Sequence, residues 1–194
     1  VAAVMGLRGL PYRWGGDVMV GLDPAASEFY RRGKYRLDCE GLSLTADQLI
    51  ARYRRWAVKY PLSTLEDGLA QDDWDGWSRL TAELGPRLTL VGDDLFATNA
   101  ARLKRGIERQ VANAVLIKPN QVGTLTETVA TMRLARQHGY RLAVSHRSGE
   151  TTDPFIVDLA VAGQADYLKA GAFARGERVA KWNRLLAIAA ELEA

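Results

Sequence analysis

The chain has 194 residues, of which 47% are hydrophobic, and its formal net charge is +3. This length suits one domain with a buried core, and no apolar stretch approaches the roughly 20 residues needed to span a membrane, so membrane insertion is not expected. The basic residues are dispersed and accompany no nucleic-acid-binding module, so we expect no nucleic-acid partner.

Six short apolar runs each end abruptly in a charged or polar functional group. In chain order they are residues 18–22 before Asp23, 62–65 before Glu66, 88–92 before Asp93, 114–117 before Lys118, 142–144 before Ser145–Ser148, and 165–168 before Lys169. Continuous apolar runs are typical of buried parallel strands. In barrels of such strands the chemistry collects at the carboxyl ends of the strands. The pattern therefore predicts one site that holds all of these groups.

Helical patterns separate the apolar runs. Thr45 and Gln48 have the spacing of a capping box and open a helix that extends to about Tyr60. Asp72-Asp73-Trp74 opens a second helix that closes near Gly85, and further helices are expected over residues 100–110, 125–138, 154–161 and 177–192. In the last helix, the periodicity predicts an inward face formed by Val179, Trp182, Leu185, Leu186 and Ala189. Residues Val1–Met5 resemble the end of a helix, and we expect the chain to be part of a longer protein.

The alternation of strands and helices predicts an α/β fold with a parallel sheet. A barrel is favoured over an open, doubly wound sheet because every predicted strand end carries a functional group. An open sheet concentrates its site at one switch point, which would leave most strand ends without such groups. The length is nevertheless short for a complete eight-stranded barrel of about 250 residues.

Asp23, Glu66 and Asp93 follow three different predicted strands. Three carboxylates brought together repel one another, and a hard cation such as Mg²⁺ relieves that repulsion. The sequence has no Cys or His pair at zinc spacing, which argues against zinc. The alternative is that the acidic doublets at 66–67 and 93–94 are helix-start charges favoured by the helix dipole.

The remaining strand ends are mostly cationic. Lys118 either extends its charge to solvent at the barrel rim or acts as a base, because neighbouring positive charges favour the neutral amine. Arg147 and Ser148 suit a phosphate or carboxylate, and Lys169 adds a second positive charge. His146 is equally consistent with a hydrogen-bonded rim residue and with a substrate contact. Together these groups suggest proton abstraction next to a carboxylate in an anionic, phosphorylated substrate.

Five segments of the chain resemble the enolase family. They are Gly21–Tyr30, Leu65–Leu69, Gly92–Leu95, Lys118–Thr124 and Ser145–Thr151. The resemblance extends from about Val18 to the end of the chain and is to the C-terminal barrel domain of glycolytic enolases. It implies an α/β, TIM-like barrel of which residues 1–194 supply about six of eight strands, without the N-terminal lid domain and the first barrel strands.

The resemblance also implies an activity: the Mg²⁺-dependent, reversible dehydration of 2-phosphoglycerate to phosphoenolpyruvate in glycolysis. Matched by motif, the implied Mg²⁺ ligands are Asp23, Glu66 and Asp93, the last two also binding substrate. Lys118 matches the base that removes the proton from C2. The other implied substrate-binding residues are His146, Arg147 and Ser148 near the phosphate and Lys169 at the carboxylate. One departure lies beside this set, since the family usually has Thr-Gly where this chain has Ala170-Gly171.

Family enolases are cytoplasmic and usually homodimeric, with octamers in some bacteria and cell-surface or secreted pools in some members. A glutamate on an earlier strand protonates the leaving hydroxide, and a mobile loop closes over the substrate. Because residues 1–194 contain neither, we expect negligible activity from them alone. Two alternatives are an enolase-superfamily enzyme acting on another carboxylate and a truncated, non-catalytic paralogue that serves as a binding or scaffold protein.

Overall fold

The computed structural model describes residues 11–193, which form two compact units. Unit 1 contains residues 11–95 together with Arg109–Ala112. Unit 2 contains Phe96–Glu108 and the residues from Asn113 onward. The helix end expected at Val1–Met5 lies outside the described residues.

Unit 1 contains three parallel strands, and all three were predicted. They are β1 (Val20–Leu22), β5 (Leu62–Glu66) and β6 (Thr89–Gly92). Strand β5 pairs with β1 on one side and with β6 on the other. Every residue of β6 is buried, as its continuous apolar run requires.

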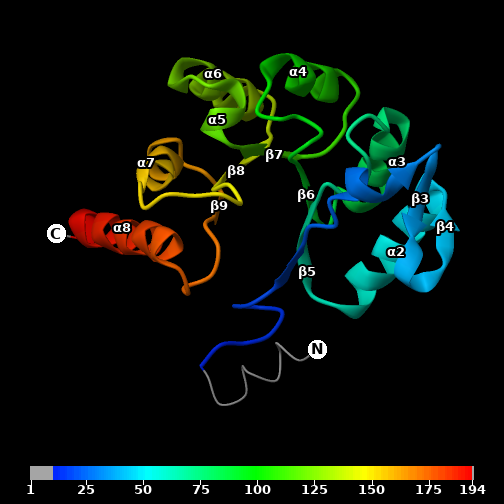
Figure 1. Ribbon diagram of the computed structural model, residues 1–194, viewed down its shortest axis with the longest axis horizontal. Coiled ribbons are helices and arrows are strands. Elements are labelled where there is room, and N and C mark those ends of the chain that lie inside the picture. The colour runs from blue at the N-terminus through cyan, green and yellow to red at the C-terminus, as the bar shows by residue number, and fades with distance from the viewer. Residues whose placement is uncertain (1–10, 194) are drawn as a thin grey trace. The chain divides into compact units, whose positions relative to one another are not determined.

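A small antiparallel sheet in unit 1 was not predicted (Figure 1). Between β1 and β5 the chain forms two 3₁₀ turns, η1 (Ala26–Phe29) and η2 (Asp38–Glu40), and the strands β2 (Tyr30–Arg31), β3 (Lys34–Leu37) and β4 (Leu42–Leu44). These strands are too short for apolar alternation to stand out. The hairpin between β2 and β3 turns through Arg32 and Gly33, both at positive φ, as a tight two-residue turn requires.

The helices of unit 1 begin where their caps predict. Helix α2 (Ala46–Lys59) starts with the expected capping box, and the Asp73 side chain caps α3 (Trp74–Leu84) by accepting the Gly76 N–H. The buried hydroxyl of Tyr35 donates to Asp73 over 2.7 Å and accepts the Ala70 N–H over 3.0 Å. Through these bonds the small sheet is tied to the start of α3.

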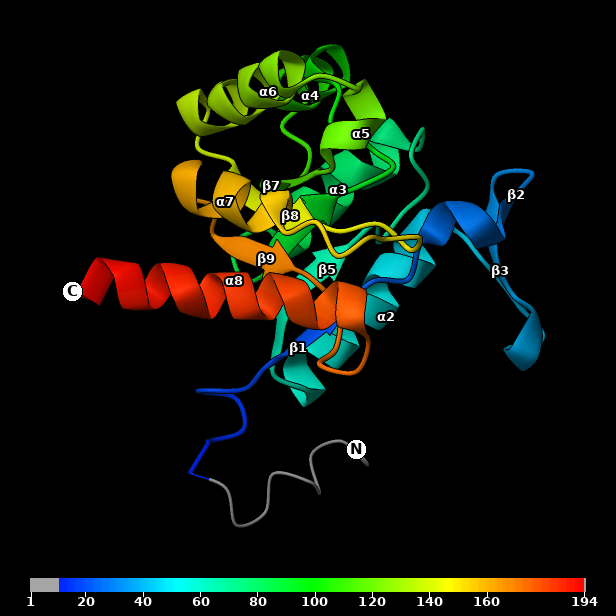
Figure 2. The same ribbon diagram turned by 60° about the vertical axis from the view of Figure 1, so that its left-hand side comes forward.

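Unit 2 contains the other three predicted strands, which are also parallel. They are β7 (Ala114–Ile117), β8 (Arg141–Ser145) and β9 (Tyr167–Lys169), with β8 in the middle. The helices of this unit are α4 (Ala100–Glu108), α5 (Pro119–Val122), α6 (Leu125–Gln137), α7 (Phe155–Ala162) and α8 (Gly176–Glu193). Figure 2 shows α4 and α6 side by side. No helix in the described part of the chain has the length and apolar content needed to cross a bilayer.

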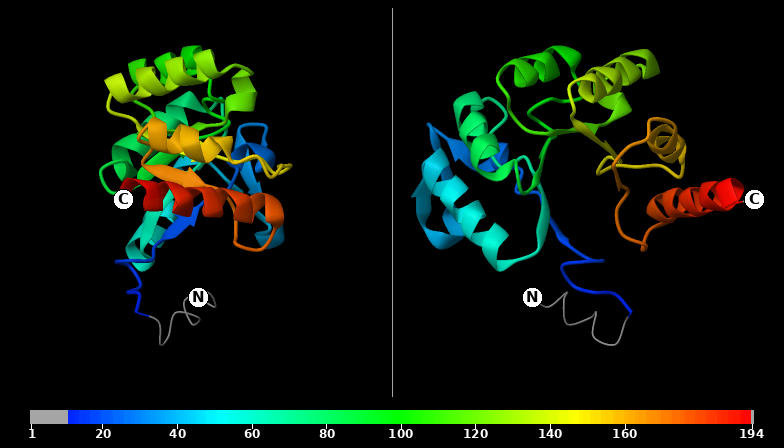
Figure 3. Two further views of the ribbon diagram at one scale, coloured as in Figure 1. Left: turned by 90° about the vertical axis from the view of Figure 1, so that its left-hand side faces the viewer. Right: turned by 180° about the vertical axis from the view of Figure 1, so that it is seen from behind.

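The predicted inward face of α8 was wrong at Leu186 and Ala189, whereas Val179, Trp182 and Leu185 are half-buried. Helix α8 lies beside α7 (Figure 3), but its buried residues are Arg178, Lys181 and Ile188. Leu186, which the periodicity placed inside, is 68% exposed, and Ala189 is also exposed. Two charged side chains therefore occupy the buried face of this helix because, as described below, each finds polar partners there.

Candidate active site

The three acidic residues predicted to bind a metal all lie in unit 1, at the carboxyl ends of its parallel strands. Glu66 is the last residue of β5, whereas Asp23 and Asp93 directly follow β1 and β6. Because these strands are parallel neighbours, their carboxyl ends lie at the same edge of the sheet. Glu66 is buried, Asp93 is half-buried and Asp23 is exposed.

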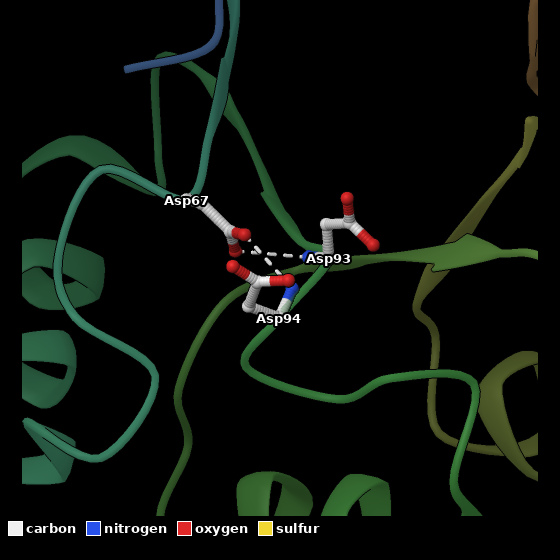
Figure 4. Close-up of side chains that lie close together, drawn as sticks. All are labelled: Asp67, Asp93 and Asp94. Atoms are coloured by element: carbon white, nitrogen blue, oxygen red, sulfur yellow. Dashed lines mark hydrogen bonds between the residues drawn. The ribbon is translucent and has the colours of Figure 1, made fainter. Parts of the chain in front are cut away.

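An acidic cluster forms at this edge, and its members differ from the predicted set. Asp67, Asp93 and Asp94 each place one carboxylate oxygen within 4.8 Å of the other two (Figure 4). Asp23 and Glu66 do not belong to this group. Carboxylate oxygens are the ligands that a hard cation such as Mg²⁺ prefers. The donor chemistry of the edge therefore fits the predicted metal, while the roles of Asp23 and Glu66 as ligands stay a prediction.

Asp67 joins three strand ends. Its carboxylate accepts the N–H groups of Asp93 and Asp94 over 2.9 and 2.8 Å, drawn as dashed lines in Figure 4. Its own N–H donates to the Val91 carbonyl, and its carbonyl accepts the Ala26 N–H, each over 3.0 Å. Because both carboxylate oxygens already accept an amide, we interpret Asp67 as the support of the loop that carries Asp93, outside the metal's own ligands.

The environment of Asp67 opposes its ionisation. Burial raises the pKa of its carboxyl group to about 7, while the two amide hydrogen bonds act in the opposite direction. Sequence reasoning considered Asp67 only as a helix-start charge, but α3 begins at Trp74 and α4 at Ala100. The acidic doublets at 66–67 and 93–94 were the visible signal for this cluster.

The cationic residues predicted to act on substrate lie in unit 2. Lys118 directly follows β7, and its N–H donates to Oγ1 of the fully buried Thr98 over 2.9 Å. Lys169 ends β9, and its carbonyl accepts the N–H of His146 over 2.9 Å. The loop that follows β8 is thereby joined to the end of β9.

A pocket of about 190 Å³ opens beside the loop that follows β8. His146 and Arg147 line it together with Asn120 from the segment after β7. Nη1 of Arg147 donates to Oδ1 of Asn120 over 3.0 Å, which holds the guanidinium at the pocket wall. Ser148 lies exposed on the same loop. A guanidinium held in this way, with a hydroxyl nearby, suits an anionic group such as a phosphate.

His146 contacts a residue that the sequence did not single out. Its Nδ1 lies 2.6 Å from Nη1 of Arg178, a residue of α8. Burial lowers the pKa of His146, and the positive charge of Arg178 lowers it further. Periodicity offered no signal for Arg178, because a charged residue on an amphipathic helix is expected to face solvent.

Comparison with known proteins decides the family. Residues 10–194 match the family model described as the C-terminal TIM barrel domain of enolase. The chain belongs to the enolase family. It is 56% identical over 177 residues to the enolase of Rubrobacter xylanophilus, covering 91% of this chain and 41% of that protein. It is 52% identical over 181 residues to the enolase of Natranaerobius thermophilus, covering 93% and 42%.

The family and the described strands together confirm the predicted fold. This enolase chain has three parallel strands in each unit among its described residues, with helices between them, as expected for part of a TIM-like barrel. It spans about two fifths of the length of the two curated enolases given above.

Proposed function

We propose that the whole protein catalyses the reversible, Mg²⁺-dependent dehydration of 2-phosphoglycerate to phosphoenolpyruvate, as glycolytic enolases do. One observation carries the proposal: the family match covers all six strand ends at which the sequence predicted functional groups. The carboxylates of unit 1 suit a hard cation, and the guanidinium, hydroxyl and ammonium groups of unit 2 suit an anionic substrate.

In the proposed reaction, Nζ of Lys118 acts as the base that takes the proton from C2 of 2-phosphoglycerate. The electron pair of the C–H bond then moves towards the neighbouring carboxylate. Asp23, Glu66 and Asp93 would hold Mg²⁺, which when bound supplies positive charge that stabilises this enediolate-like state. Hydroxide leaves C3 and becomes water with a proton from the general acid, the role that the family gives to a glutamate on an earlier strand, and C2 and C3 become doubly bonded.

Other residues of unit 2 would hold the substrate in place. Arg147 and Ser148 would bind the phosphate, and Asn120 would keep the Arg147 guanidinium at the pocket wall. Lys169 would pair with the substrate carboxylate, and His146 would lie beside the substrate. Correct placement of reacting groups accounts for a large part of enzymatic rate enhancement, so these contacts would matter for the chemical step.

The test uses the whole protein and follows phosphoenolpyruvate formation with Mg²⁺ and with a chelator. We expect turnover that the chelator abolishes, and a fall of about 10²–10⁴-fold in kcat for Lys118→Ala. Lys104→Ala is the matched control because Lys104 is exposed on α4; it should behave as the parent. Undiminished turnover by Lys118→Ala would refute the assigned base. A parent without turnover in Mg²⁺ would refute the activity and favour the non-catalytic alternative.

Three further expectations belong to the proposal. We expect the whole protein to be cytoplasmic and homodimeric, and residues 1–194 expressed alone to have negligible activity. Sedimentation of the whole protein would check the oligomeric state, and an assay of the isolated chain at matched concentration would check its activity.

A further inference from the structure

The buried face of α8 carries two positive charges. Lys181 is fully buried and Arg178 is 8% exposed. Burying a charged group is costly unless hydrogen bonds and opposite charges compensate it. Each side chain must therefore have acceptors within reach, and those acceptors lie almost entirely on one segment, residues 146–151, which we call the substrate loop.

Arg178 contacts the first half of the substrate loop at three consecutive residues. Nη1 lies 2.6 Å from Nδ1 of His146 and donates to the Arg147 carbonyl over 2.9 Å. Nη2 donates to the Ser148 carbonyl over 3.0 Å. The planar guanidinium presents its donors in a fixed fork, so these contacts define the course of the loop backbone as well as the position of the His146 ring.

Lys181 contacts the second half of the same loop. Its Nζ lies 2.6 Å from the carboxylate of Glu150 and donates to the Thr151 carbonyl over 2.9 Å. A third bond, over 3.0 Å, goes to the Glu177 carbonyl of α8 itself. The two cations, one helical turn apart, therefore hold the loop at both ends.

The contact between Arg178 and His146 also determines where the imidazole proton lies. An arginine side chain stays protonated in proteins and can only donate, so the Nδ1 that faces it must accept. A neutral imidazole with Nδ1 as acceptor carries its proton on Nε2.

Neighbouring packing keeps the pair together. Gly171 has φ +80°, and a Cβ atom there would lie 3.0 Å from both Cδ of Arg178 and Cε1 of His146. Trp182 on α8 donates from Nε1 to the Gly171 carbonyl over 3.0 Å. The backbone at Gly171 therefore packs closely against both side chains, and any larger residue there would displace one of them.

We propose that Arg178 and Lys181 are positioning residues for the substrate loop, and that Arg178 holds His146 as the neutral Nε2–H tautomer. The consequence for catalysis rests on the proposed function, since that function makes His146, Arg147 and Ser148 substrate contacts. The charged groups that act on His146 are Arg178 and Lys169, which disfavour its protonation, and Glu150, which favours it.

The first test observes His146 directly in the whole protein, with ¹⁵N-labelled histidine and His146→Gln to assign its signals. We expect an Nε2–H tautomer that stays neutral below the ordinary histidine pKa of about 6.5. In Arg178→Met, the pKa of His146 should rise towards that value and the tautomer preference should be lost. His138, which is exposed, serves as the internal reference. An Nδ1–H tautomer in the parent, or identical titration in both proteins, would overturn the proposal.

The second test is kinetic. Arg178→Met should lower kcat/KM by about 10²-fold, as expected for displaced substrate contacts, and should add an acidic limb to the pH profile near pH 6.5. Arg178→Lys, which keeps the charge but not the fork, should recover only part of this loss. Arg184→Met is the matched control, since Arg184 also lies on α8 but pairs with Asp158 of α7 and Glu191 of α8, away from the substrate loop. If Arg184→Met lost as much as Arg178→Met, positioning by Arg178 would be refuted.

A third variant isolates Lys181. Removing one partner of a buried ion pair can unfold a protein, so Lys181→Met is made together with Glu150→Gln, and the single variant Glu150→Gln is measured beside it. The double variant should raise KM about tenfold while His146 keeps its tautomer. A parent-like KM in a folded double variant would refute the role of Lys181. The histidine spectra need no turnover, so an inactive parent would refute the proposed function without deciding the tautomer.

Discussion

Replacement of Asp67 by alanine should weaken both the fold of unit 1 and the binding of Mg²⁺. The change removes two hydrogen bonds from amides to a carboxylate, of 2.9 and 2.8 Å. Hydrogen bonds to charged groups contribute about 1.5–3 kcal/mol each. Asp93 and Asp94 are half-buried, so in the variant water can hydrogen-bond to their N–H groups and recover part of the lost stabilisation. Removing the Asp67 carboxylate also removes the free-energy cost of burying it. We therefore expect a loss of about 2 kcal/mol in the free energy of unfolding.

The effect on metal binding follows from the geometry of the same loop. Without Asp67, the backbone N–H groups of Asp93 and Asp94 lose the acceptor that orients them. Loss of a residue that hydrogen-bonds to metal ligands typically lowers metal affinity by about 10–100-fold. The dissociation constant for Mg²⁺ should therefore rise by about that factor. Asp67→Asn keeps one carbonyl acceptor and should lie between the parent and Asp67→Ala.

The assay is calorimetric titration of the whole protein with Mg²⁺, combined with unfolding in denaturant. Asp75→Ala is the control, because Asp75 is an exposed aspartate of the same unit that pairs with Arg109 at the surface. It should change the unfolding free energy by less than about 1 kcal/mol and leave Mg²⁺ affinity unchanged. A folded Asp67→Ala protein that binds Mg²⁺ as tightly as the parent would show that Asp67 does not support the metal site.

Three other substitutions test side chains within single units. Tyr35→Phe removes a bond to Asp73 and should lower the free energy of unfolding by about 1–3 kcal/mol. Tyr53→Phe should leave the free energy of unfolding unchanged or raise it, since the buried Tyr53 hydroxyl has no hydrogen-bond partner among the described residues. If denaturant unfolding showed the same loss of stability for Tyr35→Phe and Tyr53→Phe, this reasoning would be contradicted. Asn120→Ala releases the Arg147 guanidinium and should raise KM for 2-phosphoglycerate about 2–10-fold with little change in kcat. A fall in kcat at constant KM would count against this role.

The sequence alone was enough to locate the parallel strands and the groups at their ends. Buried parallel strands require continuous apolar runs, and the residue after each run lies at the carboxyl end of the strand by chain order alone. For the same reason, the helix starts at Thr45 and Asp73 were predictable, because a cap bonds to an amide only three residues away. These features depend on residues close together in the chain.

Tertiary structure decided what depends on residues far apart in the chain. Strands β2–β4 are only two to four residues long and exist through pairing with one another. Asp67 gained its role from amides 26 and 27 residues away, and Arg178 from acceptors about 30 residues away. Periodicity assigns a charged residue on a helix to solvent, because burial without partners is prohibitive. On α8 the carbonyl groups of the substrate loop and the carboxylate of Glu150 remove that cost, and only the folded chain brings them to the helix.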